Sequence, residues 1–184
     1  MSEMRLISPF SEADIARLKA GDGVLISGTV YAARDAAHRR FAELLTKGEE
    51  LPIDLRGATI YYMGPSPTPP GKIIGACGPT TSSRMDKCTP QLLAYGVKAM
   101  VGKGGRSNDV KKSIVEYHAV YFVTLGGAGA LLAKRVKNCE MVAYPELGTE
   151  AVLKLEFEDF PAIVAIDSRG NDLFETGPLA YRRV

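Results

Sequence analysis

Residues 119–125 form a nearly continuous run of apolar, β-branched and aromatic side chains. Such a run is typical of a strand that is covered on both faces, and strands of that kind occur mainly in parallel sheets flanked by helices. The turn Gly126-Gly127-Ala128-Gly129 follows at once and leads into a helix that we expect to end near Val136. This segment therefore favours an α/β fold.

The same order of strand, turn and helix recurs along the chain. Residues 24–30 predict a strand, and residues 34–45 predict an amphipathic helix that ends near Gly48. Residues 58–63 and 97–101 predict two more strands. Further helices are indicated by their end signals, which are Ser11 with a stop at Gly21, Thr89-Pro90 with a stop at Gly96, and Ser107 before a helix toward Tyr117.

The C-terminal part has a different pattern. Residues 152–158 alternate between apolar and polar side chains, and residues 162–166 lead into the turn residues Asp167 to Asn171, which predicts antiparallel strands with one solvated face. The proline-rich residues 64–71 predict a stiff connection that is too short to link two domains. We therefore expect one α/β domain over residues 1–184, with a mainly parallel sheet and additional antiparallel strands.

The stretch from residue 72 to residue 86 carries the first indication of a binding site. Residues 72–77 resemble a strand, and Pro79 followed by hydroxyl residues is typical of a helix start. In such a helix Thr80 and Arg84, four residues apart, share one face, and the N–H groups of the first turn point outward with a partial positive charge. This arrangement predicts an anion site, although a capped helix with an exposed arginine remains an alternative.

The charge and hydropathy of the chain limit the size of that anion. The net charge is only +2, and no basic run is longer than two residues, so a small anionic ligand fits better than nucleic acid. No apolar stretch approaches the roughly 20 residues of a membrane span, and the first residues lack the apolar core of a signal peptide. We expect a cytoplasmic protein that binds neither nucleic acid nor membranes.

The metal-binding inventory of the chain is poor. Cys77, Cys88 and Cys139 show no C-x-x-C spacing, and their odd number argues against a disulfide framework. His38 and His118 lie 80 residues apart. The pattern predicts no metal site made wholly by this chain, favours the cysteines as small buried apolar residues, and assigns no chemical role to either histidine.

Two glycine-rich turns resemble nucleotide-binding loops but lack the necessary residues. The turn at residues 102–105 has no following Ser or Thr, and the turn at residues 127–132 has Leu132 where a dinucleotide fold requires its third glycine. Lys103, however, follows a predicted strand at its C-terminal end, where open α/β sheets usually bind ligands. The pattern alone favours Arg34 as a solvated residue at a helix start and Asp35 as a first-turn acid over a role of either residue in a site.

Three motifs together resemble one family. They are Gly28-Thr29-Val30 with Arg34-Asp35-Ala36-Ala37-His38-Arg39-Arg40, then Gly78-Pro79-Thr80-Thr81-Ser82-Ser83-Arg84-Met85, and Gly102-Lys103-Gly104. In this combination the chain resembles the β subunit, or C-terminal domain, of class I fumarate hydratase and of the related L-tartrate dehydratase. The resemblance runs in order from about residue 24 to residue 175.

The resemblance implies an iron–sulfur hydro-lyase that interconverts (S)-malate and fumarate plus water, built on a swivelling three-layer β/β/α domain. In that family a 4Fe–4S cluster is held by three cysteines of the α subunit, with one iron open to substrate. The cysteines of this chain do not match those ligand positions. The resemblance therefore implies a chain that binds no cofactor or metal by itself and that works in a hetero-oligomer such as α2β2.

The resemblance also implies roles for single residues. Those for substrate binding are Arg34, Arg84, Thr81 and Gly104, and those for catalysis are Thr80, Lys103 and Asp35. Guanidinium groups can hold both ends of a small dicarboxylate, since each forms paired, charge-assisted hydrogen bonds with a carboxylate. Thr80 corresponds to the proposed base, and an alcohol acts as a base only where nearby positive charge, here from Lys103 and Arg84, favours its alkoxide.

Two alternatives stay open at the level of sequence. The first is the β subunit of an L-tartrate dehydratase, which converts tartrate to oxaloacetate, because only a few polar contacts distinguish the extra hydroxyl group of tartrate. The second is a non-catalytic module that binds dicarboxylates with the same arginines. A neighbouring reading frame that encodes a three-cysteine α subunit would favour an enzyme over the binding module.

Overall fold

The computed structural model describes residues 4–182, so the ends of the expected domain, residues 1–3 and 183–184, lie outside the described residues. The strands are β1 (Met4–Ser8), β2 (Gly23–Ala32), β3 (Thr59–Tyr61), β4 (Ala99–Gly102), β5 (Val120–Val123), β6 (Val136–Ala143) and β7 (Val152–Ile166). The α-helices are α1 (Glu12–Arg17), α2 (Asp35–Lys47), α3 (Thr89–Tyr95), α4 (Asn108–Glu116), α5 (Gly129–Ala133) and α6 (Leu173–Tyr181), and the 3-10 helices are η1 (Ser82–Met85) and η2 (Pro145–Glu150).

The seven strands form one mixed sheet, which confirms the α/β class and the presence of both parallel and antiparallel strands. Strands β1 to β5 pair in parallel in their order along the chain. Strand β7 runs antiparallel to β5 and β6 at one edge and to β2 at the other. Because β7 joins β5 back to β2, the sheet closes on itself.

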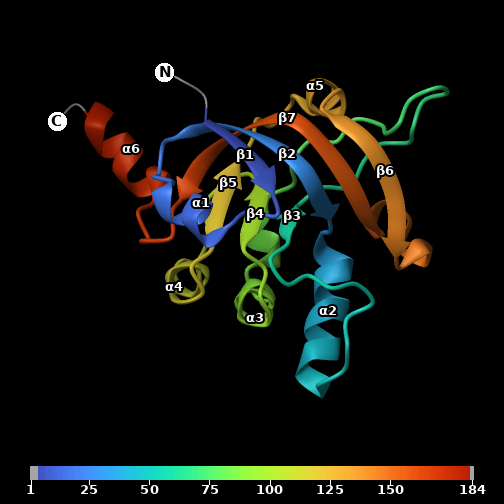
Figure 1. Ribbon diagram of the computed structural model, residues 1–184, viewed down its shortest axis with the longest axis horizontal. Helices are drawn as coiled ribbons and strands as arrows, with labels where there is room; N and C mark the ends of the chain where they lie inside the picture. The colour runs from blue at the N-terminus through green and yellow to red at the C-terminus, as the bar shows by residue number, and fades with distance from the viewer. Residues whose placement is uncertain (1–3, 183–184) are drawn as a thin grey trace.

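Alternation along the central strands divides the core into two clusters. Tyr61 and Tyr62 are neighbours in sequence but belong to different clusters, and the same holds for Tyr121 and Phe122. Successive side chains of a strand point to opposite faces, which explains this division. The cluster that includes Leu155, Phe157 and Phe160 of β7 lies inside the closed sheet, and the other is covered by α2, α3 and α4, which lie together on one side in Figure 1.

The helix ends follow the sequence signals closely. Ser11 and Asp14 form a complete capping box at α1, and Ser107 accepts a hydrogen bond from the Val110 N–H at the start of α4. Gly48 and Gly96 end α2 and α3 with positive φ angles of 70° and 125°. Helix α1, however, already ends at Arg17, so the expectation that Gly21 stops it is wrong.

The C-terminal part differs from the prediction in three ways. Residues 152–166 form a single strand, β7, with Asp159 at a positive φ of 50°. Helix α5 ends at Ala133, and Val136 begins β6 instead of ending a helix. Strand β6 was not predicted, and neither was the N-terminal strand β1. Both lie at edges of the sheet, and the burial of β6 follows no regular alternation. None of the helices over residues 4–182 is long and apolar enough to cross a membrane.

The expected strand at residues 72–77 is not formed. These residues belong to an irregular segment, the proline-rich arm (residues 64–76) with the adjoining Cys77, that pairs with no strand. Its backbone is satisfied by scattered contacts instead. The Ser66 N–H donates to the Ala76 carbonyl at 2.9 Å, the Cys77 N–H donates to the Gly129 carbonyl at 3.1 Å, and the Tyr61 hydroxyl donates to the Cys77 carbonyl at 2.6 Å.

Candidate functional site

The candidate residues gather where the parallel strands end. Arg34 follows β2, Gly64 follows β3, Lys103 follows β4 and Gly126 follows β5. Since these strands are parallel and adjacent, their carboxyl ends meet at one edge of the sheet, which is where α/β folds usually bind ligands. The prediction that Lys103 follows a strand end is therefore confirmed.

Arg34, Asp35 and Arg84 form one charged cluster. The Asp35 carboxylate accepts a hydrogen bond from Arg84 Nε at 2.6 Å and another from Arg34 Nε at 3.1 Å. The Asp35 side chain is 14% exposed, whereas those of Arg34 and Arg84 are 21% and 49% exposed. The cluster thus presents two guanidinium groups that share one anionic partner.

The environment of Asp35 keeps its carboxyl group ionised. Burial raises the pKa of Asp35, but hydrogen bonds from Arg84, from its own backbone N–H and from Arg34 together lower it below the ordinary value of 3.8. An ionised carboxylate that is stabilised in this way is a weak base and a poor proton donor at neutral pH. These contacts suit Asp35 to orienting the two arginines.

Glu150 also holds Arg34, and the sequence analysis did not identify it. Its carboxylate accepts a hydrogen bond from the Ala36 N–H at 2.6 Å, at the start of α2, and lies 3.7 Å from Arg34 Nε. Arg34 further packs on Gly64, where an added Cβ would lie 3.2 Å from the arginine side chain. Glu150 is 114 residues away from Ala36 along the chain, so no local pattern indicates this contact.

The segment from Thr80 to Arg84 lies against the Lys103 turn. The Ser82 N–H donates to the Lys103 carbonyl at 3.0 Å, and the Lys103 N–H donates to Ser82 Oγ at 3.1 Å. Thr81 and Lys103 form an isolated parallel bridge, and the Thr80 N–H donates to the Tyr62 carbonyl at 2.7 Å. The two motifs, which are about 20 residues apart in sequence, are thus neighbours at the same edge.

The expected helix start at Pro79 is wrong. Helix η1 is a four-residue 3-10 helix that begins at Ser82, and its cap residue Thr81 makes no capping hydrogen bond. Thr80 therefore lies outside the helix, and it cannot share a helical face with Arg84. A helix this short also supplies no substantial dipole, so the positive charge of the site comes from arginine and lysine side chains instead.

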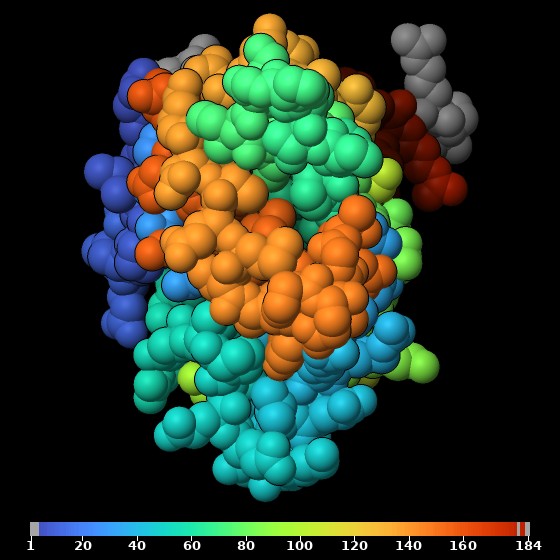
Figure 2. Space-filling model, turned by 90° about the vertical axis from the view of Figure 1, so that its right-hand side faces the viewer, coloured from blue at the N-terminus to red at the C-terminus, as the bar shows by residue number. Residues whose placement is uncertain are grey.

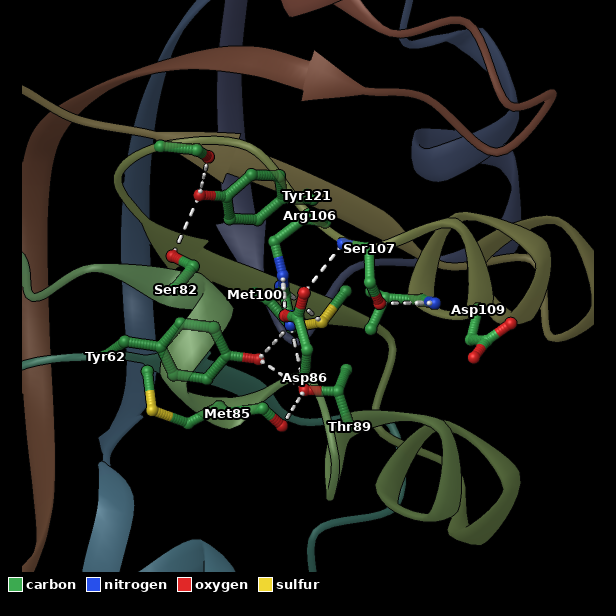
Figure 3. Close-up of polar contacts among 12 residues, drawn as sticks. Tyr62, Ser82, Met85, Asp86, Thr89, Met100, Arg106, Ser107, Asp109 and Tyr121 are labelled. Atoms are coloured by element: carbon green, nitrogen blue, oxygen red, sulfur yellow. Dashed lines mark hydrogen bonds and ion pairs between the residues drawn. The ribbon is translucent and has the colours of Figure 1, made fainter.

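Arg106 is a buried charge that the sequence analysis did not identify. Its side chain has no exposed surface, and its guanidinium group lies 5.2 Å and 4.9 Å from the ring centres of Tyr62 and Tyr121. Arg106 Nε donates to Asp86 Oδ1 at 2.7 Å, and Nη2 donates to Thr89 Oγ1 at 2.8 Å (Figure 3). An arginine after a glycine-rich turn gives no sequence signal that distinguishes a buried guanidinium from a solvated one.

Gly102 allows the close approach of the two segments. A Cβ at this position would lie 2.0 Å from Ser82 Oγ and 3.0 Å from Tyr62 Cδ2. We expect Gly102→Ala to lower the free energy of unfolding by about 1–3 kcal/mol, because the added methyl group has no space. Urea denaturation measures this change. Gly105→Ala is the matched control, since a Cβ there would meet nothing within 4 Å. Equal stability of the two variants would contradict the tight contact.

His38 is buried beneath the charged cluster. Its Nδ1 lies 3.0 Å from the Arg34 carbonyl, which can only accept, so Nδ1 carries the proton. The ring packs against Tyr62, with 5.2 Å between ring centres. Burial lowers the pKa of His38 from 6.5 to about 4. A neutral imidazole therefore fixes the backbone of Arg34.

This pKa predicts a specific dependence of stability on pH. The folded pKa of His38 lies below the unfolded one, so its neutral form contributes fully above pH 6.5, and that contribution is lost as the pH falls toward 4. The loss reaches about 3 kcal/mol. We expect the free energy of unfolding of His38→Met, measured with urea, to change less between pH 6.5 and 4.5 than that of the wild type. The exposed His118 at a φ of 49° offers the control His118→Asn, which should keep the wild-type slope. A wild-type slope in His38→Met would contradict the assignment.

The residues of this chain do not fit an iron–sulfur cluster. Thiolates are the usual cluster ligands, whereas burial raises the pKa of Cys77 to about 12 and also raises the pKa values of Cys88 and Cys139. The three cysteines lie on separate segments, and no group of three potential metal ligands occurs among the described residues.

One cavity of the molecule is separate from the charged cluster. It has a volume of about 470 Å³ and lies between the proline-rich arm (residues 64–76) and residues 130–137. In Figure 2 this arm, in green, stands next to the orange segment that contains α5 and the start of β6. None of the predicted site residues lines this cavity. The charged cluster and Lys103 instead lie at the carboxyl ends of the parallel strands.

Comparison with known proteins identifies relatives over most of the chain. Residues 1–177 match the family described as "Fumarase C-terminus". The chain is 40% identical to the anaerobic class I fumarate hydratase of Escherichia coli K12 over 165 residues, which are 89% of this chain and 30% of that protein. It is also 40% identical to the putative L(+)-tartrate dehydratase subunit beta of Methanocaldococcus jannaschii, over 90% of this chain and 88% of that protein. The chain thus spans about 30% of the fumarate hydratase and nearly all of the smaller subunit.

Proposed function

Because this chain belongs to the fumarase C-terminus family of hydro-lyases, we propose that it is the β subunit of a two-subunit fumarate hydratase. In this proposal it binds the two carboxylates of malate or fumarate and transfers the proton. The observation that carries the proposal is the pair of arginines joined through Asp35 at the carboxyl edge of the parallel strands.

The proposed binding mode follows from charge. A C4 dicarboxylate is a dianion, and Arg34 and Arg84 offer two planar guanidinium groups at one edge of the sheet. Asp35 and Glu150 hold these groups in place before the substrate arrives. Thr81 and Gly104, on the two segments that meet at Lys103, are proposed to contact the substrate through their polar groups. Each charge-assisted hydrogen bond contributes roughly 1.5–3 kcal/mol.

The proposed proton transfer uses Thr80. Removal of the proton next to a carboxylate places further negative charge on that carboxylate, so preorganised cations stabilise the transition state. Lys103 follows β4 beside the segment of Thr80, and no ion pair within residues 4–182 neutralises its ammonium group. The positive charges of Lys103 and Arg84 are proposed to favour the alkoxide of Thr80. Asp35 is proposed to act by orienting the arginines.

The remainder of the enzyme is proposed to lie on a partner. The chain spans 30% of the Escherichia coli fumarate hydratase but 88% of a protein described as a separate subunit. We infer that an α subunit, in a complex such as α2β2 in the cytoplasm, corresponds to the missing part and holds a 4Fe–4S cluster. The closed sheet with helices on one face is compatible with a swivelling three-layer domain, which we propose as the finer description of the fold.

A tartrate dehydratase is the second candidate, because the relative that this chain nearly covers is described as the beta subunit of such an enzyme. Anaerobic co-expression with a three-cysteine α subunit, followed by turnover assays, distinguishes the two. The proposal predicts a higher kcat/KM for (S)-malate than for L(+)-tartrate. The reverse order would replace fumarate hydratase by tartrate dehydratase, and binding of dicarboxylates without any turnover would indicate a binding module.

A further inference from the structure

Arg106 lies at the junction of the two segments that carry the proposed site. Asp86 follows η1, which contains Arg84, and Arg106 follows the Lys103 turn. The Asp86 carboxylate accepts hydrogen bonds from Arg106 Nε at 2.7 Å and from the Ser107 N–H at 2.7 Å. The Asp86 carboxylate of the first segment thus binds two consecutive residues of the second segment, Arg106 and Ser107.

The other contacts of Arg106 extend this junction to the strands. Its guanidinium group lies between Tyr62, next to the end of β3, and Tyr121 of β5, as Figure 3 shows. The Tyr121 hydroxyl lies 2.8 Å from Ser82 Oγ and 2.8 Å from the Gly104 carbonyl, so it reaches both segments. Tyr121 therefore contacts both the Arg106 guanidinium group and the two segments that meet at Ser82 and Lys103.

We propose that Arg106 is a positioning residue that sets the place of Lys103 relative to Thr80, without contacting the substrate. This inference rests on the proposed function for the roles of Lys103 and Thr80. Its geometric part, that Arg106 joins the two segments, rests on the contacts alone. The carboxylate-binding cluster of Arg34, Asp35 and Arg84 includes no residue of the Lys103 segment.

A guanidinium group is required because the contacts diverge. Arg106 Nε reaches Asp86, Nη2 reaches Thr89, and Nη1 lies 3.6 Å from Met100 Sδ. A lysine at this position would keep the positive charge but would have one donor centre in place of three. Arg106→Lys therefore tests orientation while it leaves Asp86 with a cationic partner.

The test uses Arg106→Lys in the complete complex, with activity normalised to folded protein by circular dichroism. We expect kcat to fall by about tenfold to a hundredfold with little change in KM, because a misplacement of about 1 Å can cost about a hundredfold in rate. We also expect the acidic limb of the pH profile of kcat to move to higher pH, since a displaced Lys103 favours the alkoxide of Thr80 less. Lys111→Met removes two remote ion pairs, with Asp172 and Glu175, and is the control for lost stability.

Amide hydrogen exchange on this chain tests the junction independently of activity. Arg106→Lys should lose protection at the Ser82, Lys103 and Ser107 N–H groups and keep it elsewhere. A wild-type pH profile, or an equal loss of kcat in Lys111→Met, would overturn the positioning role. If the wild-type complex turns over neither malate nor tartrate, the proposed function fails. In that case hydrogen exchange alone tests the junction. Amide protection in Arg106→Lys that is unchanged, or lowered uniformly along the chain, would contradict the proposal that Arg106 joins the two segments.

Discussion

Replacing Thr80 with valine should lower kcat of the complete enzyme by about 10²-fold to 10⁴-fold, with KM little changed. Valine keeps the shape of threonine but has no hydroxyl group, and loss of a general base typically has an effect of this size. The backbone N–H of residue 80, which donates to the Tyr62 carbonyl, is retained, so the segment should keep its place. The initial rate of fumarate hydration, followed by the loss of fumarate absorbance, measures this change.

Thr46→Val is the matched control, since Thr46 is an exposed residue of α2 whose hydroxyl contacts only its own helix and Gln91. This control should keep wild-type kcat. Wild-type kcat in Thr80→Val itself would remove Thr80 from proton transfer and would assign the base to the partner.

Replacing Arg84 with alanine should lower kcat/KM by about tenfold to 150-fold. This range corresponds to the loss of a charge-assisted hydrogen bond of roughly 1.5–3 kcal/mol. The variant also leaves Asp35 with Arg34 as its remaining arginine partner, so the substrate carboxylate meets less positive charge. Arg34→Ala should have a similar effect. Steady-state kinetics with fumarate and with (S)-malate measure both variants.

Arg39→Ala provides the comparison, because Arg39 lies on the exposed side of α2, within five residues of Arg34. Its kcat/KM should equal that of the wild type. If Arg84→Ala and Arg39→Ala behave alike, Arg84 does not bind a substrate carboxylate.

The sequence predicted the elements whose signals are local. The capping box at Ser11 and the glycines that end α2 and α3 depend on neighbouring residues, so the chain pattern was sufficient. The failure at residues 72–77 has a different origin. Only Ile74, Gly75 and Cys77 of this run are buried, and Cys77 contacts Tyr61 and Gly129, which are distant in sequence, instead of pairing with a strand. Apolar periodicity cannot distinguish these two forms of burial.

The candidate site also contains some residues that have a sequence signal and others whose contacts depend on distant parts of the chain. Motif resemblance indicated Arg34, Arg84 and Lys103, and the fold brings their segments to one edge of the sheet. The residues that hold them, Glu150 and Arg106, carry no such signal, because their partners lie on other elements. Their contacts arise only when the chain is folded. The predicted roles of the site residues remain proposals that the substitutions above can test.

We propose that this chain supplies carboxylate binding and proton transfer to a reaction that it cannot perform by itself. Anaerobic assay of fumarate hydration tests it most directly, with this chain alone, with the three-cysteine partner alone, and with both combined. We predict turnover only in the combined sample, with malate formed in an amount equal to the fumarate lost. Full activity of either chain alone would contradict the proposed division of the active site.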